Sequence, residues 1–343
     1  MGWFTGGSFD QHALYAAGPQ AHAIEHLFWF YVALLSVVVV SVLCSVALAI
    51  IKRRTRSSGL TTPALAAEEM PEREPMRQIA PLDAGREKRG RARIILSTVL
   101  TAIALIVLLA ESISTSNALE ALSGGQHIEI QVTGRQWWWQ VRYLDPEPTR
   151  VFNTANELHL PLGHSVRLRL SAADVIHSFW APNLQGKRDL IPGHDNDLVL
   201  RVDRPGRYRM QCAEFCGGAH AQMAMWIVAE PRADYEAWCT QQRQSAREPV
   251  TELQREGRAV FLRAQCPTCH TISGTSAQAN WAPDLTHAGS RIGIGAASFP
   301  NRRGFLAGWL LGAPAMKPAV HMPRLTLPAR DLQALVAYLE SLQ

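Results

Sequence analysis

The most apolar parts of the chain are two uncharged runs in its first third. Residues 27–51 carry no charge, and because a membrane-spanning helix needs ~20 apolar residues, this run predicts a transmembrane helix. The second run, 94–110, is shorter, and it predicts a transmembrane helix over 94–114 if the helix also uses flanking residues. A buried core helix of a soluble domain is the alternative for each run.

Basic residues are spread unevenly around these runs. Residues 1–26 contain no Lys or Arg, whereas the loop 52–93 contains eleven. Because Lys and Arg favour cytoplasmic loops, we expect this loop in the cytoplasm and both ends of the chain outside. The pattern therefore predicts a multi-pass membrane protein with its larger domains on the outer side, which in a bacterial inner (cell) membrane is the periplasmic side. The net charge of +5 is too small to indicate a nucleic-acid partner.

Short runs of alternating apolar and polar residues follow, separated by Gly and Pro. The clearest are 127–132, 166–171, 197–202, 207–212 and 223–228. Regular short strands within ~100 residues predict an all-β sandwich of the Greek-key type, here over 125–231.

Soft metal ligands are concentrated at the end of this predicted sandwich. Cys212, Cys216, His220 and Met223 offer two thiolates, an imidazole and a thioether, which is the set that suits copper. The spacing of the two cysteines is too long for a C-x-x-C zinc pair. A second imidazole can come from His177, which we expect to end a strand. The alternative is a disulfide, a surface histidine and a core methionine.

Residues 206–228, GRYRMQCAEFCGGAHAQMAMWIV, resemble the copper-A loop of cytochrome c oxidase subunit II, and 174–193 resemble that family's upstream histidine segment. The resemblance implies a cupredoxin-like fold and a dinuclear copper-A centre. Both cysteine sulfurs bridge the coppers, and each histidine binds one copper. Weak ligands are the Met223 thioether and the Glu214 backbone carbonyl. The Glu214 carboxylate is implied to bind magnesium at the contact with the catalytic subunit.

Other residues of this domain have roles that only the resemblance supplies. Trp137, in the run of three tryptophans 137–139, resembles the residue at which electrons enter, although three indoles on a strand also predict core packing for at least one. Asp174 and Asp189 lie in matching segments. They are expected at the subunit contact, or else as solvated loop carboxylates.

The last part of the chain contains Cys266-Pro267-Thr268-Cys269-His270. C-x-x-C-H attaches c-type haem through two thioethers, with the histidine as one axial ligand. The resemblance extends here to class I cytochromes c: Met322, in a KPxxxMP context, is the expected distal ligand, with Met316 and His321 as competitors. Pro283 is expected to supply a carbonyl to the His270 ring.

These signals predict an all-α cytochrome c domain over 253–343, with a terminal helix at 329–342, joined by a helical linker at 232–252. The whole chain then resembles the fused subunit II of caa-type oxidases. One departure concerns the second apolar run. In relatives its helix opens with a Glu before a Trp-Thr motif, where protons enter, whereas here Glu87 is only a distant counterpart.

The function that the resemblance implies is that of subunit II of a respiratory cytochrome c oxidase. Electrons from a c-type cytochrome or a quinol–cytochrome c reductase pass through haem c and copper A to subunit I. Subunit I reduces O2 to water, coupled to proton translocation, with subunit III as a further partner. The alternatives are the copper-A subunit of a nitric-oxide reductase, a nitrous-oxide reductase, and a free-standing membrane-anchored electron carrier.

Overall fold

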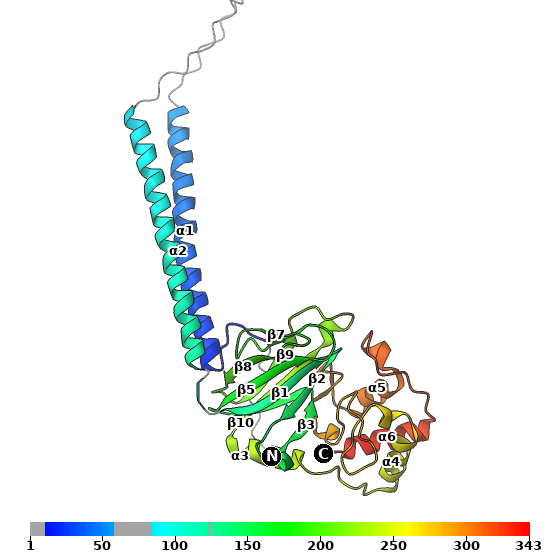
Figure 1. Ribbon diagram of the computed structural model, residues 1–343. Helices are drawn as coiled ribbons and strands as arrows, with labels where there is room; N and C mark the ends of the chain where they lie inside the picture. Colours follow the sequence, from blue (N-terminus) through cyan, green and yellow to red (C-terminus); the bar gives the residue numbers. More distant parts are fainter. Residues whose placement is uncertain (1–10, 58–83, 123, 126) are drawn as a thin grey trace, which may run out of the picture. The chain divides into compact units, whose positions relative to one another are not determined.

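The computed structural model describes residues 11–57 and 84–343, apart from 123 and 126 (Figure 1). Most of the predicted loop 52–93 and the first ten residues of the predicted segment 1–26 lie outside the described residues. The chain divides into two units. One is helical and covers His26–Ala118, and the other contains the residues before it and everything from Leu119 onward.

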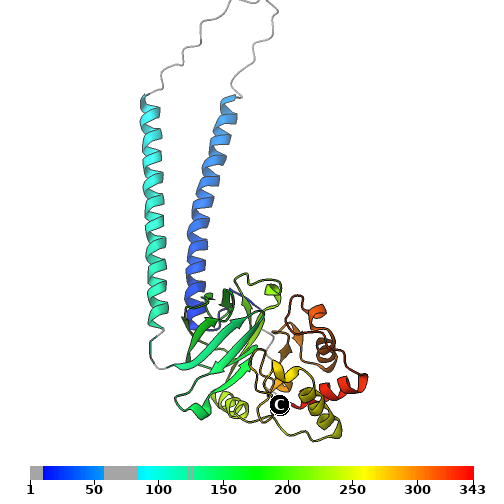
Figure 2. The ribbon, with the colours of Figure 1, turned by 45° about the vertical axis from the view of Figure 1, so that its right-hand side comes forward.

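The helical unit is built from α1 (Pro19–Ser57) and α2 (Ala84–Ala121), which run in opposite directions (Figure 2). Within the described residues, both helices are long and apolar enough to cross a membrane. The Tyr31 hydroxyl donates to Leu108 O at 3.3 Å. Both helices continue beyond the predicted apolar runs. On the side of the predicted loop 52–93, the residues next to the runs are rich in Arg and Lys, which are also good helix formers.

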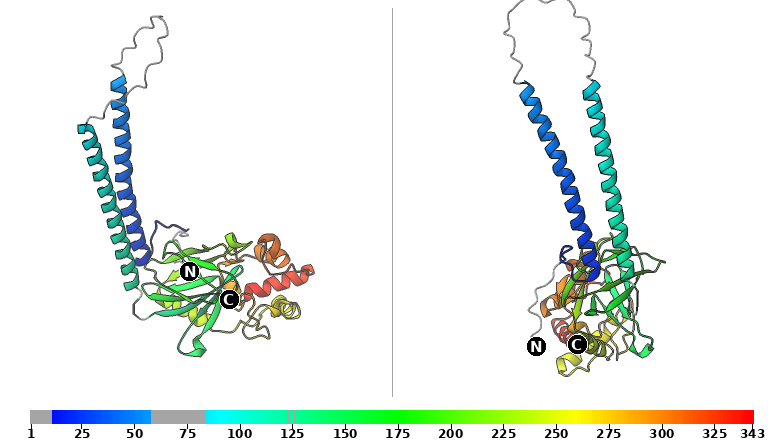
Figure 3. Two further views of the ribbon diagram at one scale, coloured as in Figure 1. Left: turned by 45° about the horizontal axis from the view of Figure 1, so that its top comes forward. Right: turned by 90° about the vertical axis from the view of Figure 1, so that its left-hand side faces the viewer.

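Residues 128–230 form a sandwich of two five-stranded sheets in the described chain (Figures 1 and 3). The first sheet has the order β3 (Phe152–Ala155), β2 (Trp138–Tyr143), β1 (Ile128–Arg135), β5 (Ser165–Ala172) and β8 (Asn196–Arg201). The second has the order β4 (Glu157–Pro161), β10 (Ala224–Glu230), β9 (Gly206–Cys212), β6 (His177–Trp180) and β7 (Arg188–Leu190).

The alternating pattern of the sequence is what builds this sandwich. In β5, for example, Val166, Leu168 and Leu170 are buried, whereas the residues between them are not. Because side chains on a strand point alternately to opposite faces, one face of each sheet enters the shared core. The predicted strands are confirmed, with one correction. His177 begins β6 instead of ending a strand.

The rest of the second unit is mainly helical. Its helices are α3 (Arg232–Gln242), α4 (Glu252–Arg263), α5 (Arg303–Met316) and α6 (Ala329–Ser341), and a small sheet pairs β11 (Gly293–Ile294) with β12 (Phe299–Pro300). Short 3-10 turns are η1 (Pro148–Arg150), η2 (His220–Gln222), η3 (Cys266–Thr268) and η4 (Ala288–Ser290). The expected terminal helix is confirmed as α6.

The linker between the two domains is helical only in its first half. Helix α3 ends at Gln242, and the next helix, α4, starts anew after Thr251. The Thr251 side chain accepts from Gln254 N, and the Gln254 side chain accepts from Thr251 N, which together form a capping box. This reciprocal cap satisfies backbone donors at the start of α4 and separates α4 from the linker.

Candidate metal centres

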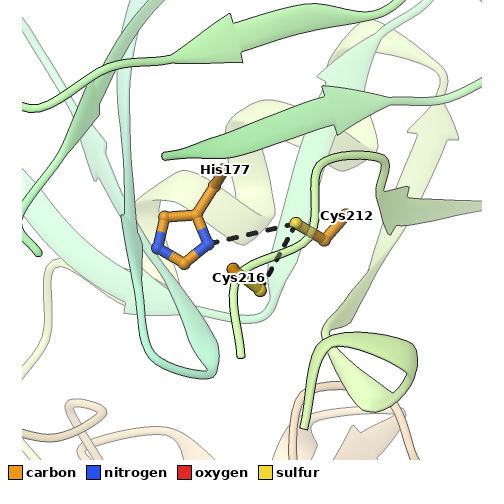
Figure 4. A group of neighbouring side chains, drawn as sticks. All are labelled: His177, Cys212 and Cys216. Atoms are coloured by element: carbon orange, nitrogen blue, oxygen red, sulfur yellow. Dashed lines mark hydrogen bonds between the residues drawn. The ribbon is translucent and has the colours of Figure 1, made fainter. Parts of the chain in front are cut away.

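The predicted copper ligands come from one loop and one neighbouring strand. Cys212 is the last residue of β9, and the loop that follows it, residues 212–223, is called the ligand loop below. His177 reaches this loop because β6 pairs with β9, which sets Phe179 opposite Cys212. Figure 4 shows the His177 ring and both cysteine sulfurs turned toward one another.

The side chains of all five predicted ligands converge. The Cys212 and Cys216 sulfurs are 3.8 Å apart, and neither cysteine is in a disulfide. The other separations are Cys212 Sγ to His177 Nδ1 3.9 Å, Cys216 Sγ to His220 Nδ1 3.5 Å, and Cys216 Sγ to Met223 Sδ 3.8 Å. The Glu214 carbonyl oxygen, the sixth expected ligand, lies 3.3 Å from Cys212 Sγ. This donor set, with its sulfurs and imidazole nitrogens facing inward, fits copper.

The two thiols have unequal acidities. The contact with the Cys216 thiol lowers the pKa of Cys212 far below its ordinary value, against the effect of burial, and His177 adds to the lowering. The same contact and burial raise the pKa of Cys216. Burial by itself would lower the pKa of His177, but Cys212 and Asp174 raise it. The pocket thus holds one thiolate readily and favours positive charge beside it, as a cation site does.

Asp174 orients the His177 ring. Its carboxylate lies 2.8 Å from His177 Nε2 and also accepts from the backbone nitrogens of Gln136 and Val175, at 2.7 Å each. Nδ1 is thereby left facing the sulfurs, which is the usual arrangement for a metal-binding histidine. Sequence reasoning missed this role, although the i, i+3 spacing of the two residues is its signal. Asp189 instead accepts from the Ser178 hydroxyl at 2.7 Å.

Trp137 lies against the ligand loop and is only 7% exposed. Its indole Nε1 donates to Cys216 O at 2.9 Å, and the Gln136 side chain donates to the same oxygen at 2.7 Å. On its other side the indole meets the His321 ring, with the ring centroids 5.3 Å apart. Of the three consecutive tryptophans, Trp139 is the completely buried core residue.

Two of the predicted haem residues lie at the core of the C-terminal domain, residues 253–343, whereas Cys269 is exposed. Cys266 and Met322 both pack against that core. Met316 is instead the last residue of α5, and its sulfur would lie 3.3 Å from a Cβ added to Gly308 of the same helix. His270 Nδ1 donates to Pro283 O at 2.7 Å, as expected. Burial lowers the pKa of His270, so its ring is neutral and its other nitrogen is available to a metal.

Arg291 adds a second observation that fits haem. Its Nε is buried and has no hydrogen-bond partner among the described residues. A buried guanidinium nitrogen without a partner is unfavourable, and a carboxylate group of a haem would satisfy it.

Comparisons with known proteins agree with these two domains. The family model described as cytochrome C oxidase subunit II, periplasmic domain, matches residues 128–230, and the model described as cytochrome c matches 254–343. Cytochrome c oxidase subunit 2 of Alkalihalophilus pseudofirmus is 36% identical over 221 residues, which is 64% of this chain and 63% of the relative. Cytochrome c oxidase subunit 2 of Bacillus sp. (strain PS3) is 30% identical over 269 residues, 73% of this chain and 74% of the relative.

Among solved structures, the periplasmic domain of subunit II of cytochrome oxidase of Bradyrhizobium japonicum is 27% identical, with a TM-score of 0.33. The matched region is 35% of this chain and 96% of the solved chain. The two family models, taken with the helices, give a chain in which a cupredoxin-like domain and a cytochrome c domain follow two helices that are apolar enough to cross a membrane. The chain belongs to the cytochrome c oxidase subunit II family, in a form with a fused cytochrome c domain, which confirms the resemblance noted in the sequence.

Proposed function

We propose that this chain is the electron-accepting subunit II of a membrane-bound cytochrome c oxidase. In this proposal the chain carries a dinuclear copper-A centre and one covalent haem c, and subunit I holds the oxygen-reducing site. The observation that carries the proposal is the convergence of five ligand side chains and the Glu214 carbonyl in the ligand loop, next to a domain with its own haem-attachment motif.

The residues that would hold copper are His177, Cys212, Cys216, His220 and Met223, with the Glu214 carbonyl as the sixth ligand. Haem would be attached through Cys266 and Cys269, with His270 and Met322 as axial ligands. When bound, the two centres each store and release one electron at a time. The surrounding residues hold these ligands in place. Asp174 orients His177, and Pro283 orients His270.

A continuous series of contacts joins the two sets of ligands. Met322 is bonded to His321, the His321 ring meets the Trp137 indole, and the indole donates a hydrogen bond to Cys216 O. We infer that Trp137 is the residue at which electrons reach the ligand loop. Trp137 itself is nearly completely buried, whereas His321 is exposed.

The remaining parts of the proposal concern partners and topology. We propose that α1 and α2 anchor the chain in a bacterial inner membrane, with both metal domains on the periplasmic side. Subunit I would contact Glu214, and a magnesium ion would lie between them. Subunit III, a c-type cytochrome or quinol–cytochrome c reductase as donor, and coupling to proton translocation complete the proposed complex.

Electron-spin resonance of the full-length, copper-loaded chain tests the site. We expect a signal split by two equivalent copper nuclei, because the two sulfurs lie 3.8 Å apart and would be shared by both coppers. Cys216→Ser should abolish the shared signal, whereas Cys239→Ser, at a buried cysteine of α3, should preserve it. A signal from mononuclear copper alone in the unaltered chain would show that the ligand assignment is wrong.

A further inference from the structure

The C-terminal domain contacts the sandwich next to the ligand loop. Part of this contact is formed by residues 292–298. Its hydrogen bonds are Ala224 N to Ala296 O at 3.2 Å, Arg209 to Ala297 O at 2.9 Å, Ser298 Oγ to Gln222 O at 3.0 Å, and Ile292 N to the Glu157 carboxylate. Three of these bonds use backbone atoms of the C-terminal domain, and a fourth uses a serine hydroxyl. The contact therefore requires a defined backbone position more than a particular set of charges.

Residues 317–322, called the methionine loop here, form the second part of the contact. The methionine loop and Trp137 each come close to the ligand loop at one of its glycines. A Cβ on Gly218 would lie 2.7 Å from the Ala319 Cβ, and a Cβ on Gly217 would lie 3.0 Å from Trp137 Cζ2. Gly217 also has φ +107°, a conformation that strongly favours glycine. The two glycines thus allow Trp137 and the methionine loop to pack on the ligand loop together.

Lys317 lies at the centre of this contact and is 1% exposed. Its ammonium group donates to Trp137 O at 2.7 Å and to Gly295 O at 3.0 Å, one carbonyl from each domain. Burial lowers the pKa of Lys317 to about 7. Burying a charged group costs free energy, and an apolar side chain would fill the same space without this cost. The ammonium group at this position therefore points to a specific attachment.

We propose that Lys317 is a positioning residue that fastens the methionine loop to the backbone of Trp137 and so holds the C-terminal domain over the ligand loop. This inference rests on the proposed function, which gives Met322 and Trp137 their roles. With the domain held in this way, His321 and the methionine loop cover the Trp137 indole. An external donor protein therefore delivers electrons to the C-terminal domain, and Trp137 receives them only from within the chain.

Hydrogen–deuterium exchange of the full-length protein in detergent tests the attachment. The reporters are the amides of Ala224 and Ile292, because both donate across the contact. Lys317→Met keeps the length of the side chain and removes the ammonium group. We expect at least tenfold faster exchange at both reporters, with unchanged exchange in the paired strands β1 and β5.

Lys187→Met is the matched control, since Lys187 is the only other lysine after α2 and is exposed. It should leave both reporters unchanged. Equal exchange in Lys317→Met and the unaltered protein would overturn the proposal.

If Lys317→Met loses protection throughout the second unit, Lys317→Gln decides, because Gln keeps a polar group in the buried space but is shorter and lacks the ammonium group that reaches both carbonyls. Faster exchange confined to the two reporters supports the attachment, and any other pattern contradicts it. Spin resonance of the same copper-loaded samples tests the proposed copper site. Hydrogen–deuterium exchange tests the attachment by itself, because it requires no electron transfer.

Discussion

Met316 and Met322 have different surroundings, although only five residues separate them. Met322 packs against the core of the C-terminal domain, as Cys266 does, whereas the Met316 sulfur lies close to Gly308 of its own helix, α5. A sulfur already packed on a helix is poorly placed to reach a haem iron. The geometry therefore favours Met322, which the sequence context also favoured.

Replacing Met322 with Ala should lower the haem reduction potential and leave the haem covalently attached. Methionine opposite histidine raises the potential, and axial ligands span ~0.8 V, so we expect a fall on the order of 0.1 V or more. Met316→Ala is the matched control. Redox titration of the full-length chain provides the measurement. A fall in Met316→Ala with no change in Met322→Ala would reverse the assignment.

At the scale of elements, the C-terminal domain depends on the crossing of α4 and α6. Gly257 of α4 faces the backbone of Ala334 in α6, and a Cβ on Gly257 would lie 1.9 Å from Ala334 O. The capping box at Thr251 fixes where α4 begins and thus which residue meets α6. The α6 helix buries a continuous group of residues, 334–339, against this crossing.

Gly257→Ala should destabilise the C-terminal domain by about 1–3 kcal/mol or more, because the backbones of α4 and α6 must move apart. Gly304→Ala is the control within the same domain, since Gly304 lies in α5 with open space around its Cβ position. Thermal unfolding of the full-length chain, monitored by circular dichroism, compares the two. Equal unfolding temperatures would show that the close crossing of α4 and α6 is absent.

The elements of this chain were more predictable than its site details. Alternating strands and the terminal helix follow from local pattern, so β5, β9 and α6 lie within a residue or two of their predictions. His177 was assigned to the wrong end of its strand, because the pairing of β6 with β9 is not a local property. Lys317 was seen only as part of a haem motif. Its partners are backbone carbonyls distant in sequence, which leave no pattern of side chains.

At the scale of the whole molecule, one buried cluster connects the sandwich with the linker and the C-terminal domain. His159 of β4 is hydrogen-bonded to Glu230 of β10 at 2.7 Å and stacks on Trp238 of α3, with centroids 3.9 Å apart. Glu157 lies 3.8 Å from the same ring and accepts from the amide of Ile292. Burial would lower the pKa of His159, but these two glutamates raise it above its ordinary value.

This cluster predicts a pH dependence of stability. A histidine with a raised pKa in the folded state contributes its full stabilisation below the pKa of the unfolded chain, and that contribution is lost as pH rises through the folded pKa. The contribution of His159 to the free energy of unfolding should therefore fall from about pH 6.5 upward, by about 1.4 kcal/mol per unit of pKa shift. His159→Gln should flatten the curve in thermal unfolding at a series of pH values. Parallel curves for the two proteins would exclude this cluster as the source.

The attachment of the methionine loop to Trp137 has a consequence for how the chain responds to salt. Ions screen attraction between exposed charges over ~10 Å at 0.1 M, but they have little effect on buried contacts between a side chain and backbone carbonyls. A donor protein that docks from solution is sensitive to ionic strength when its partner surface is charged. In the proposed route, transfer inside this chain passes through a contact that is covalently linked and buried at Lys317. The internal step should therefore proceed at the same rate in dilute and concentrated salt, and any salt dependence should belong to the external donor.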